Sequence, residues 1–198
     1  MIRQVVIFAR APQRGQVKRR LARDVGPAAA LAFHRRTLEA LIRRLERDGR
    51  WRVWLCATPD GALGHPAFRG LAPGRRRPQG RGDLGRRMLR PFRDLPPGPL
   101  ALVGSDIPAL APRHIAHAFD LLGRHDLVFG PAGDGGFWLI GARRSRPLPA
   151  RLFAGVRWST EHALADTLAT IPAHWSAALA DTLDDVDDGA GLRRALSP

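Results

Sequence analysis

Residues 100–108 (LALVGSDIP) place the tightest constraint on what this chain can fold into. The first four are apolar and typical of a short buried strand, which Pro108 ends because proline has no backbone N–H for ladder pairing. Asp106 follows at the carboxyl end of that strand, where open α/β sheets bind ligands. A carboxylate there suits Mg²⁺ or Mn²⁺ carrying phosphates. The alternative is that Asp106 caps a helix beginning near Pro112, or forms an Asx turn.

Short apolar runs alternate with longer amphipathic segments along the chain. We expect strands over residues 2–8, 51–58, 100–106, 126–131 and 137–141. We expect helices over residues 17–25, 27–48, 84–92, 112–123 and 160–168, the last capped by Ser159 or Thr160, and a short helix at the end. The AGDGG loop is so short that the strands on either side should be antiparallel. This predicts one three-layer α/β/α domain over residues 1–198, with a mixed, mostly parallel sheet.

The net charge of +14 raises the question of nucleic-acid binding. We discount that function, because 31 arginines stand against one lysine while asparagine and tyrosine are absent, which indicates a coding bias. The arginines are scattered and form no stripe interleaved with aromatic residues. We therefore expect no nucleic-acid partner.

Cysteine content and hydropathy indicate the compartment. The single cysteine, Cys56, allows neither a disulfide framework nor a cysteine-based zinc site, which fits a reducing cytoplasm. No run of 18 apolar residues occurs, so we expect no membrane span. The first residues are typical of a core strand and not of a signal peptide. We therefore expect a cytoplasmic protein.

The only lysine, Lys18, lies in the loop after the first strand. Lysine offers a compact charge where arginine offers a planar fork, so a lysine retained in such a sequence indicates a role, unless it is there by chance. Gly15 precedes it, and Lys18 and Arg20 lie in or beside a first helical turn. Backbone N–H groups, the helix dipole and these cations, with Arg10 at the strand end, predict a phosphate site. The alternative is a solvated basic helix start.

A glycine-rich segment, PQGRGDLGRRM, occupies residues 78–88. Gln79 can pair with a base or ribose edge, and Gly82 allows close approach of the backbone to a ligand. Asp83 is placed to cap the following helix. We assign these three residues to the nucleotide site, although an ordinary glycine turn with an N-cap explains the spacing equally well.

Asp134 lies in the AGDGG loop between two strands. Gly135 and Gly136 allow the backbone to approach a substrate closely, so Asp134 is a candidate catalytic carboxylate and both glycines are candidate substrate contacts. A short Asp-Gly hairpin would use the same letters. Trp158 in the RWST segment is a candidate for shielding a sugar or base, although core packing is the more frequent use of tryptophan.

Four aspartates occur in the segment LDDVDDGAG near the C-terminus. Carboxylates before a helix stabilise its N-terminus through the helix dipole, which is one explanation of this cluster. The other is that Asp187, or Asp185, supplies a second metal ligand beside Asp106 for Mg²⁺ or Mn²⁺.

With these segments placed, the chain resembles the small bacterial GT-A-type proteins grouped as DUF2064 and often described as glycosyltransferases. More distantly, it resembles nucleotidyltransferases of the molybdenum-cofactor guanylyltransferase and phospholactate guanylyltransferase type. The matching stretches, spread over nearly the whole chain in the family's order, are FARAPQRGQVKRRL, QGRGDLGRRM, GSDIPAL, GPAGDGGFWLIG, RWST and DDVDD.

The resemblance implies a nucleotide-diphospho-sugar transferase fold with a nucleotide in the first-strand loop. It implies that Lys18 and Arg20 contact the phosphates and that Asp106 is the metal carboxylate. Two positions depart from the family pattern. Arg19 stands where threonine is usual, which changes contacts in the phosphate loop, and Ile107 stands where cysteine is frequent, which excludes a thiol role there.

These residues predict a metal-dependent transferase that uses a nucleotide-activated donor. The first hypothesis is a glycosyltransferase acting from an NDP-sugar on a small-molecule acceptor, with Asp134 orienting the acceptor hydroxyl or serving as its base. The alternative is a nucleotidyltransferase, in which a phosphorylated acceptor attacks an NTP and pyrophosphate leaves. A second alternative is a non-catalytic nucleotide-binding domain. Asp106 and Asp187 would hold Mg²⁺ or Mn²⁺, whose charge would stabilise the leaving phosphate.

Overall fold

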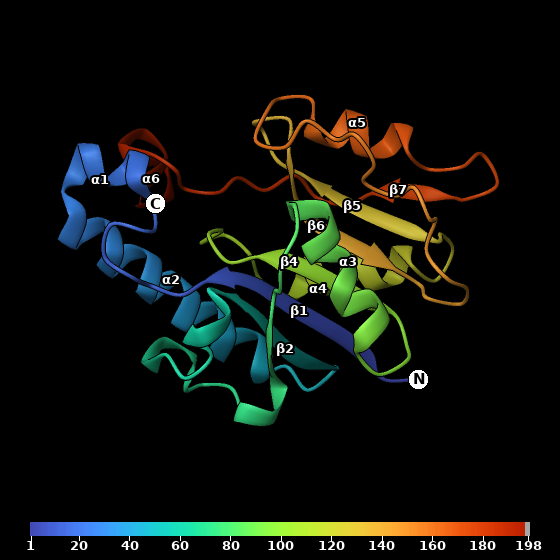
Figure 1. Cartoon of the computed structure of the whole chain (residues 1–198), viewed down its shortest axis with the longest axis horizontal. Helices are drawn as coiled ribbons and strands as arrows, with labels where there is room; N and C mark the ends of the chain where they lie inside the picture. Colours follow the sequence, from blue (N-terminus) through green and yellow to red (C-terminus); the bar gives the residue numbers. More distant parts are fainter. Residues whose placement is uncertain (197–198) are drawn as a thin grey trace.

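A seven-stranded sheet forms the centre of the computed structural model, which describes residues 1–196 (Figure 1). The strands lie in the order β3-β2-β1-β4-β6-β5-β7. Their bounds are β1 Arg3–Arg10, β2 Trp51–Thr58, β3 Arg76–Pro78, β4 Leu100–Gly104, β5 Leu127–Pro131, β6 Phe137–Ala142 and β7 Ala177–Leu179. Of the described strands, only β6 runs antiparallel to its neighbours, β4 and β5. The expected mixed, mostly parallel sheet is confirmed.

Helices cover both faces of this sheet. Their bounds are α1 Arg19–Val25, α2 Pro27–Glu46, α3 Leu84–Asp94, α4 Pro112–Leu121, α5 Ala163–Ala169 and α6 Gly189–Leu196, and three short 3₁₀ turns lie between residues 60 and 75. Residues of α2 and α4 share one hydrophobic core with the sheet, and residues of α3 and α5 share the other. In Figure 1, α1 and α6 lie together at one end of the molecule. The three-layer α/β/α arrangement follows from these two cores.

Strand β1 shows why the chain forms two cores. Val5 and Ile7 are fully buried in the core with α2 and α4, whereas Val6, between them, is fully buried in the core with α3. Alternate side chains of a strand point to opposite faces, so a continuous apolar run is required where both faces are covered. Each such side chain contributes about 1.5–3 kcal/mol by burial.

Two parallel strands deliver the predicted site residues to one edge of the sheet. Strands β1 and β4 pair as far as Phe8 and Gly104, so the loop after β1 and the residues after Gly104 start side by side. The C-terminal tail reaches the same edge, because the backbone N–H of Val186 donates to the carbonyl oxygen of Asp106 at 3.2 Å. Val186 packs there with Leu21 of α1.

Two sequence-based expectations about elements are wrong. Helix α5 begins at Ala163, and its N-cap is His162, which makes no side-chain cap; Ser159 has a left-handed backbone (φ 62°), and the Thr160 hydroxyl donates to the Arg157 carbonyl. Strand β7 was not expected, because its three residues are too few to show a period.

Within residues 1–196, no helix combines the length and apolarity needed to cross a bilayer.

Candidate functional site

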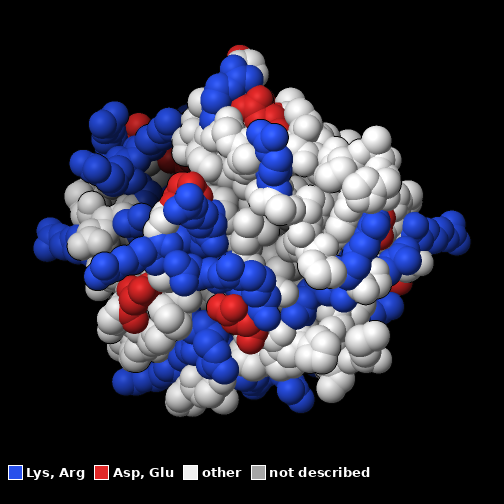
Figure 2. Space-filling view, turned by 45° about the vertical axis from the view of Figure 1, so that its right-hand side comes forward, with Lys and Arg blue, Asp and Glu red and all other residues white. Residues whose placement is uncertain are grey.

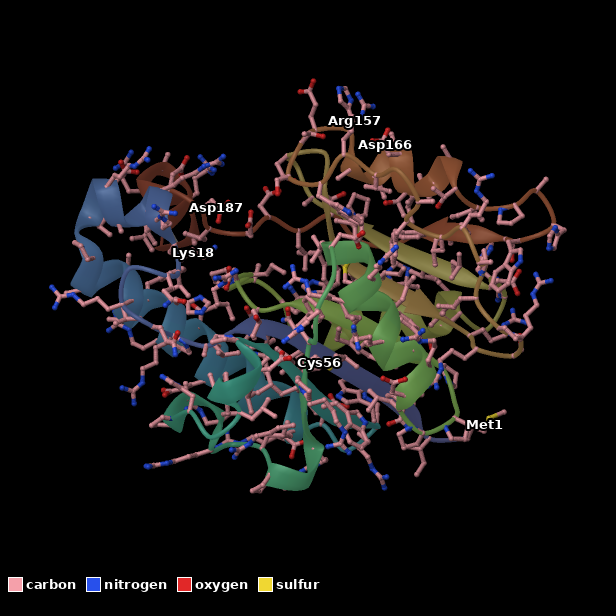
Figure 3. The ribbon with its side chains drawn as sticks, in the orientation of Figure 1. Met1, Lys18, Cys56, Arg157, Asp166 and Asp187 are labelled. Atoms are coloured by element: carbon pink, nitrogen blue, oxygen red, sulfur yellow. The ribbon has the colours of Figure 1, made fainter. Side chains whose placement is uncertain are left out.

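Three carboxylates surround the ammonium group of Lys18 at the carboxyl edge of the sheet. Lys18 Nζ lies 2.9 Å from Asp106 Oδ2, 2.8 Å from Asp187 Oδ1 and 4.0 Å from Asp185 Oδ2. The Lys18 side chain is only 3% exposed. Figure 3 shows Lys18 and Asp187 close together beside α1 and the C-terminal tail. The structure thus brings together a loop, a strand end and the tail around one cation.

The backbone of Lys18 is itself unusual. Its φ of 49° and ψ of 48° are left-handed, a conformation that costs a residue with a side chain about 1–2 kcal/mol. The residue stands immediately before α1, and its carbonyl oxygen accepts the N–H of Ala22. This conformation allows the chain to begin α1 while the Lys18 side chain points back at the carboxylates.

The charged groups of this cluster change one another's pKa values. Burial lowers the pKa of Lys18, but the opposite charges of Asp106 and Asp187 outweigh it and raise the pKa overall. Burial would raise the pKa of Asp106, yet contacts with His34 and Lys18 hold it well below its usual range. Burial and the charge of Asp187 raise the pKa of Asp185 to about 6. The cluster therefore holds three carboxylates around a single ammonium group.

His34 holds the other side of the Asp106 carboxylate. Its Nδ1 lies 3.0 Å from Asp106 Oδ1, and its Nε2 donates to the carbonyl oxygen of Arg10 at 3.0 Å. The ring is 2% exposed. The sequence analysis assigned His34 only to helix packing, because its position on the buried face of α2 carries no signal of what it meets. In the structure its ring lies between the Arg10 carbonyl oxygen and the Asp106 carboxylate and limits the space into which that carboxylate can turn.

A cavity of about 520 Å³ opens beside the cluster, and a second hollow of about 710 Å³ adjoins it at the loop of residues 15–20. Both are lined by Arg10, Arg20, His34, Asp106, Ser159 and Asp187. Within residues 1–196, the side chains of Arg10 and Arg20 make no ion pair or hydrogen bond. Two uncommitted cations thus face the same space as the carboxylates.

Most of the predicted site residues line these two hollows. They are Arg10, Gly15, Lys18, Arg20, Gln79, Asp106, Asp134, Gly136, Trp158 and Asp187. Asp185 lines the first hollow as well. The other three, Gly82, Asp83 and Gly135, lie in the neighbouring turns; Asp83 caps α3 by accepting the N–H of Arg86 at 2.8 Å. The functional roles of all these residues stay predictions.

The Gln79 amide is committed inside the protein. Its Nε2 donates to the carbonyl oxygens of Ala9 (2.9 Å) and Cys56 (3.1 Å), and its Oε1 accepts Arg87 Nη1 at 2.9 Å. The side chain is 2% exposed. Gln79 therefore joins the ends of β1 and β2 to the first turn of α3, and direct pairing with a base would require these bonds to break.

The AGDGG loop is held by close backbone contacts. A Cβ on Gly135 (φ 82°) would lie 2.1 Å from the carbonyl oxygen of Glu161, so only glycine fits there. Asp134 Oδ1 accepts the N–H of Gly136 at 2.9 Å. Leu164 donates its N–H to the Gly135 carbonyl at 3.0 Å. These contacts fix the Asp134 carboxylate at the rim of the cavity.

Aromatic side chains form one wall of the cavity. Trp158 packs against Phe137 and Phe153, with ring centroids 6.2 and 5.5 Å apart. Trp158 and Phe137 also line the cavity. Trp158 thus has the frequent structural role of tryptophan and still presents a surface to the cavity.

A larger hollow of about 870 Å³ lies away from the cluster, between α5 and Trp175. Two of its charged side chains already have partners: Asp166 is 2.8 Å from Arg157 Nη2, and the Arg146 guanidinium stacks over Trp175 at 4.0 Å. Figure 3 shows the Arg157–Asp166 pair far from Lys18. We give this hollow no role in the site.

Basic side chains cover a large part of the face shown in Figure 2. Figure 2 shows Lys and Arg across much of one face, with Asp and Glu between them and an uncharged region beside them. The expected absence of a nucleic-acid partner stays a prediction.

Residues 41–160, more than half of the chain, match the family described as "Uncharacterized protein conserved in bacteria (DUF2064)". The chain belongs to the DUF2064 family. No curated protein matches it. The resemblance inferred from the motifs is confirmed.

Solved structures agree with this assignment. A protein from Desulfovibrio desulfuricans G20, provisionally described as a nucleotide-diphospho-sugar transferase, is 27% identical with a TM-score of 0.80, over 95% of this chain and 84% of that one. CMP-2-keto-3-deoxy-manno-octonic acid synthetase, solved with CTP, is 13% identical (TM-score 0.59; 98% and 96% coverage). A Mycobacterium tuberculosis H37Rv protein, solved with manganese, is 17% identical (TM-score 0.52; 98% and 97%). The latter two support the fold alone.

Proposed function

We propose that this DUF2064 protein is a metal-dependent transferase that transfers a group from a nucleotide-activated donor to a small-molecule acceptor. The favoured donor is an NDP-sugar. The observation that carries the proposal is the cluster of Asp106, Asp185 and Asp187 around one cation, at the sheet edge where α/β folds bind ligands. The similarity to the Desulfovibrio protein supports a nucleotide-using transferase.

The donor set fits Mg²⁺ or Mn²⁺. Carboxylate oxygens are the ligands that these cations prefer, and here a lysine ammonium stands among three of them. Within residues 1–196, no group of three or more metal-ligating side chains has binding geometry in this state. Asp106 and Asp187 would hold the metal, with Asp185 beside them, once Lys18 moves away. When bound, the metal would stabilise charge on the leaving phosphate.

The remaining residues have roles that follow from their charge. Lys18, Arg10 and Arg20 bind the phosphates of the donor, because they are cations on the two hollows and the two arginines have no partner among residues 1–196. His34 keeps the Asp106 carboxylate oriented. Asp134, at the cavity rim, orients the acceptor hydroxyl or takes its proton as the bond to the donor forms.

A nucleotidyltransferase is the second candidate. Several cations lie at the loop of residues 15–20, which suits the greater negative charge of an NTP. A phosphorylated acceptor would then attack the α-phosphate and pyrophosphate would leave. A non-catalytic nucleotide-binding domain is the third candidate, and the clustering of three carboxylates around Lys18 argues against it, because crowded carboxylates destabilise a fold that gains nothing from them. A cytoplasmic location stays a prediction from the single cysteine.

A thermal-shift panel of NTPs, NDPs and NDP-sugars, each with and without Mn²⁺, tests the proposal. We expect metal-dependent stabilisation by an NDP-sugar in the wild type and its loss in Asp106→Ala. Preference for a free NTP would favour nucleotidyl transfer. Asp187→Asn serves as a milder second variant, and Asp120→Asn, at an exposed carboxylate on α4, is the matched control. Absence of any metal-dependent shift, or full binding by Asp106→Ala, would contradict the proposal.

A further inference from the structure

Arg87, in the first turn of α3, places an additional cation on the cavity wall. It lines the 520 Å³ cavity together with Leu84, Met88, Phe137 and Trp158, in the part away from the loop of residues 15–20. The sequence analysis assigned Arg87 no role, because the segment of residues 78–88 contains three arginines with no local signal that separates them.

The Arg87 guanidinium is oriented by a single neutral partner. Its Nη1 donates to Gln79 Oε1 at 2.9 Å. Because the Gln79 Nε2 faces two backbone carbonyls, the amide cannot flip, and its oxygen must point at Arg87. The planar fork of Arg87 is thereby held in one direction before any ligand arrives.

The positive charge of Arg87 has no counterpart among residues 1–196. Within residues 1–196, no carboxylate forms an ion pair with it, and its Nε is buried without a hydrogen-bond acceptor. A half-buried guanidinium beside apolar side chains loses hydration, and that cost is offset when an anion pairs with it. By contrast, Arg86 on the same turn has an 80% exposed side chain.

We propose that Arg87 binds an oxyanion of the second substrate, a phosphate or carboxylate group, at a subsite distinct from the one that holds the donor phosphates. Two parallel N–H groups of a guanidinium match two oxygens of either anion. Lys18 lines only the adjoining hollow and Arg87 only the cavity, so these two cations face different parts of the space, whereas Arg10 and Arg20 line both. The apolar wall beside Arg87 contacts the carbon skeleton of the same substrate.

This inference rests on the proposed function, since it assigns a substrate class to the same site. It requires the acceptor to be anionic, in glycosyl transfer as well as in nucleotidyl transfer. A neutral sugar acceptor would leave Arg87 without a partner in the complex.

The test measures anion binding after the donor phosphate site has been filled. The protein is saturated with Mg²⁺ and the nucleoside diphosphate that gives the largest thermal shift, and inorganic phosphate or acetate is then titrated by calorimetry. We expect one of the two to bind the wild type, and Arg87→Met to weaken it at least tenfold while changing nucleotide affinity less than twofold. The anion that binds more tightly shows whether the substrate group at Arg87 is a phosphate or a carboxylate.

Two further variants control for charge and folding. Arg86→Met removes a neighbouring charge from the same turn and is expected to leave anion binding unchanged. Arg87→Lys keeps the positive charge but loses the planar guanidinium, and its anion affinity is expected to lie between those of the wild type and Arg87→Met. The inference is overturned if neither anion binds, if Arg87→Met stays within twofold of wild type, or if nucleotide affinity falls as much as anion affinity. If no nucleotide binds at all, the proposed function fails. The anion titration is then made without nucleotide, and weaker anion binding by Arg87→Met than by the wild type would still assign the oxyanion to Arg87.

Discussion

Lys18 keeps a full positive charge in a nearly buried position because three carboxylates surround it. Breaking such a group by removing one partner leaves an uncompensated charge, which costs about 3–5 kcal/mol for a buried pair. The same carboxylates are the proposed ligands of the metal. Lysine and metal must therefore compete for the same oxygens.

Lys18→Met tests this competition at the level of one side chain. We expect the variant to bind Mn²⁺ more tightly than the wild type, by about tenfold or more, because three carboxylates would otherwise repel one another. Calorimetric titration of Mn²⁺ without nucleotide measures it. Nucleotide affinity should fall in the same variant, since a cation at the phosphates is lost. Unchanged or weaker Mn²⁺ binding would show that the cluster is an ion-pair network and not a metal site.

At the scale of elements, the attachment of β7 to β5 depends on Asp126. This carboxylate accepts the N–H and the hydroxyl of Ser176 at 3.0 Å each, and Arg146 Nη2 lies 3.2 Å away. The hydrogen bond from the Ser176 backbone N–H, more than the Arg146 charge, holds the pKa of Asp126 below its ordinary value of 3.8. Strand β7 has only three residues, so this contact just before it largely determines how β7 is aligned with β5.

Asp126→Asn is expected to lower the free energy of unfolding by about 1.5–3 kcal/mol at pH 7, the usual contribution of hydrogen bonds to a charged group. Because the folded-state pKa is the lower one, the carboxylate stabilises the fold above the unfolded pKa, and this stabilisation is lost as pH falls through the folded pKa. The difference between variant and wild type should therefore shrink from pH 6 to pH 3. Urea unfolding across this range measures it, with Asp120→Asn as control. A pH-independent difference would show that packing, and not charge, is responsible.

The whole molecule closes its site with residues from the two ends of the chain. Lys18 and Asp187 are 169 positions apart, yet their side chains meet because α1 packs against the tail and α6. Gly189 donates its N–H to Asp24 Oδ2 of α1 at 2.7 Å and fixes this contact. The sheet and its two large cores lie elsewhere and do not need the tail.

Truncation of the chain after Asp184 should remove the candidate site and leave the fold intact. We expect its far-ultraviolet circular dichroism and cooperative unfolding to be retained, because β1–β7 and both large cores remain. Metal-dependent nucleotide stabilisation should be lost with Asp185 and Asp187. If the shortened chain kept that stabilisation, the tail carboxylates would not be ligands.

Local periodicity accounts for what the sequence alone determined. The strand at Trp51–Thr58, the mixed sheet and the Asp83 cap were predicted correctly, because a short apolar run, a short loop and an N-cap are properties of neighbouring residues. The sequence also marked Lys18 and Asp106 as candidates, and both lie at the predicted edge. Their chemical roles stay predictions.

Tertiary structure alone decided which side chains meet. His34 approaches Asp106, Gln79 orients Arg87, and the tail carboxylates reach Lys18, and each pair joins separate elements. No local pattern encodes such contacts, since they depend on how helices pack across the sheet. The sequence determined the elements and the candidate residues, because these follow from short-range periodicity and residue chemistry. Only the packed fold decided the charge balance of the site, because burial and distance exist only after folding.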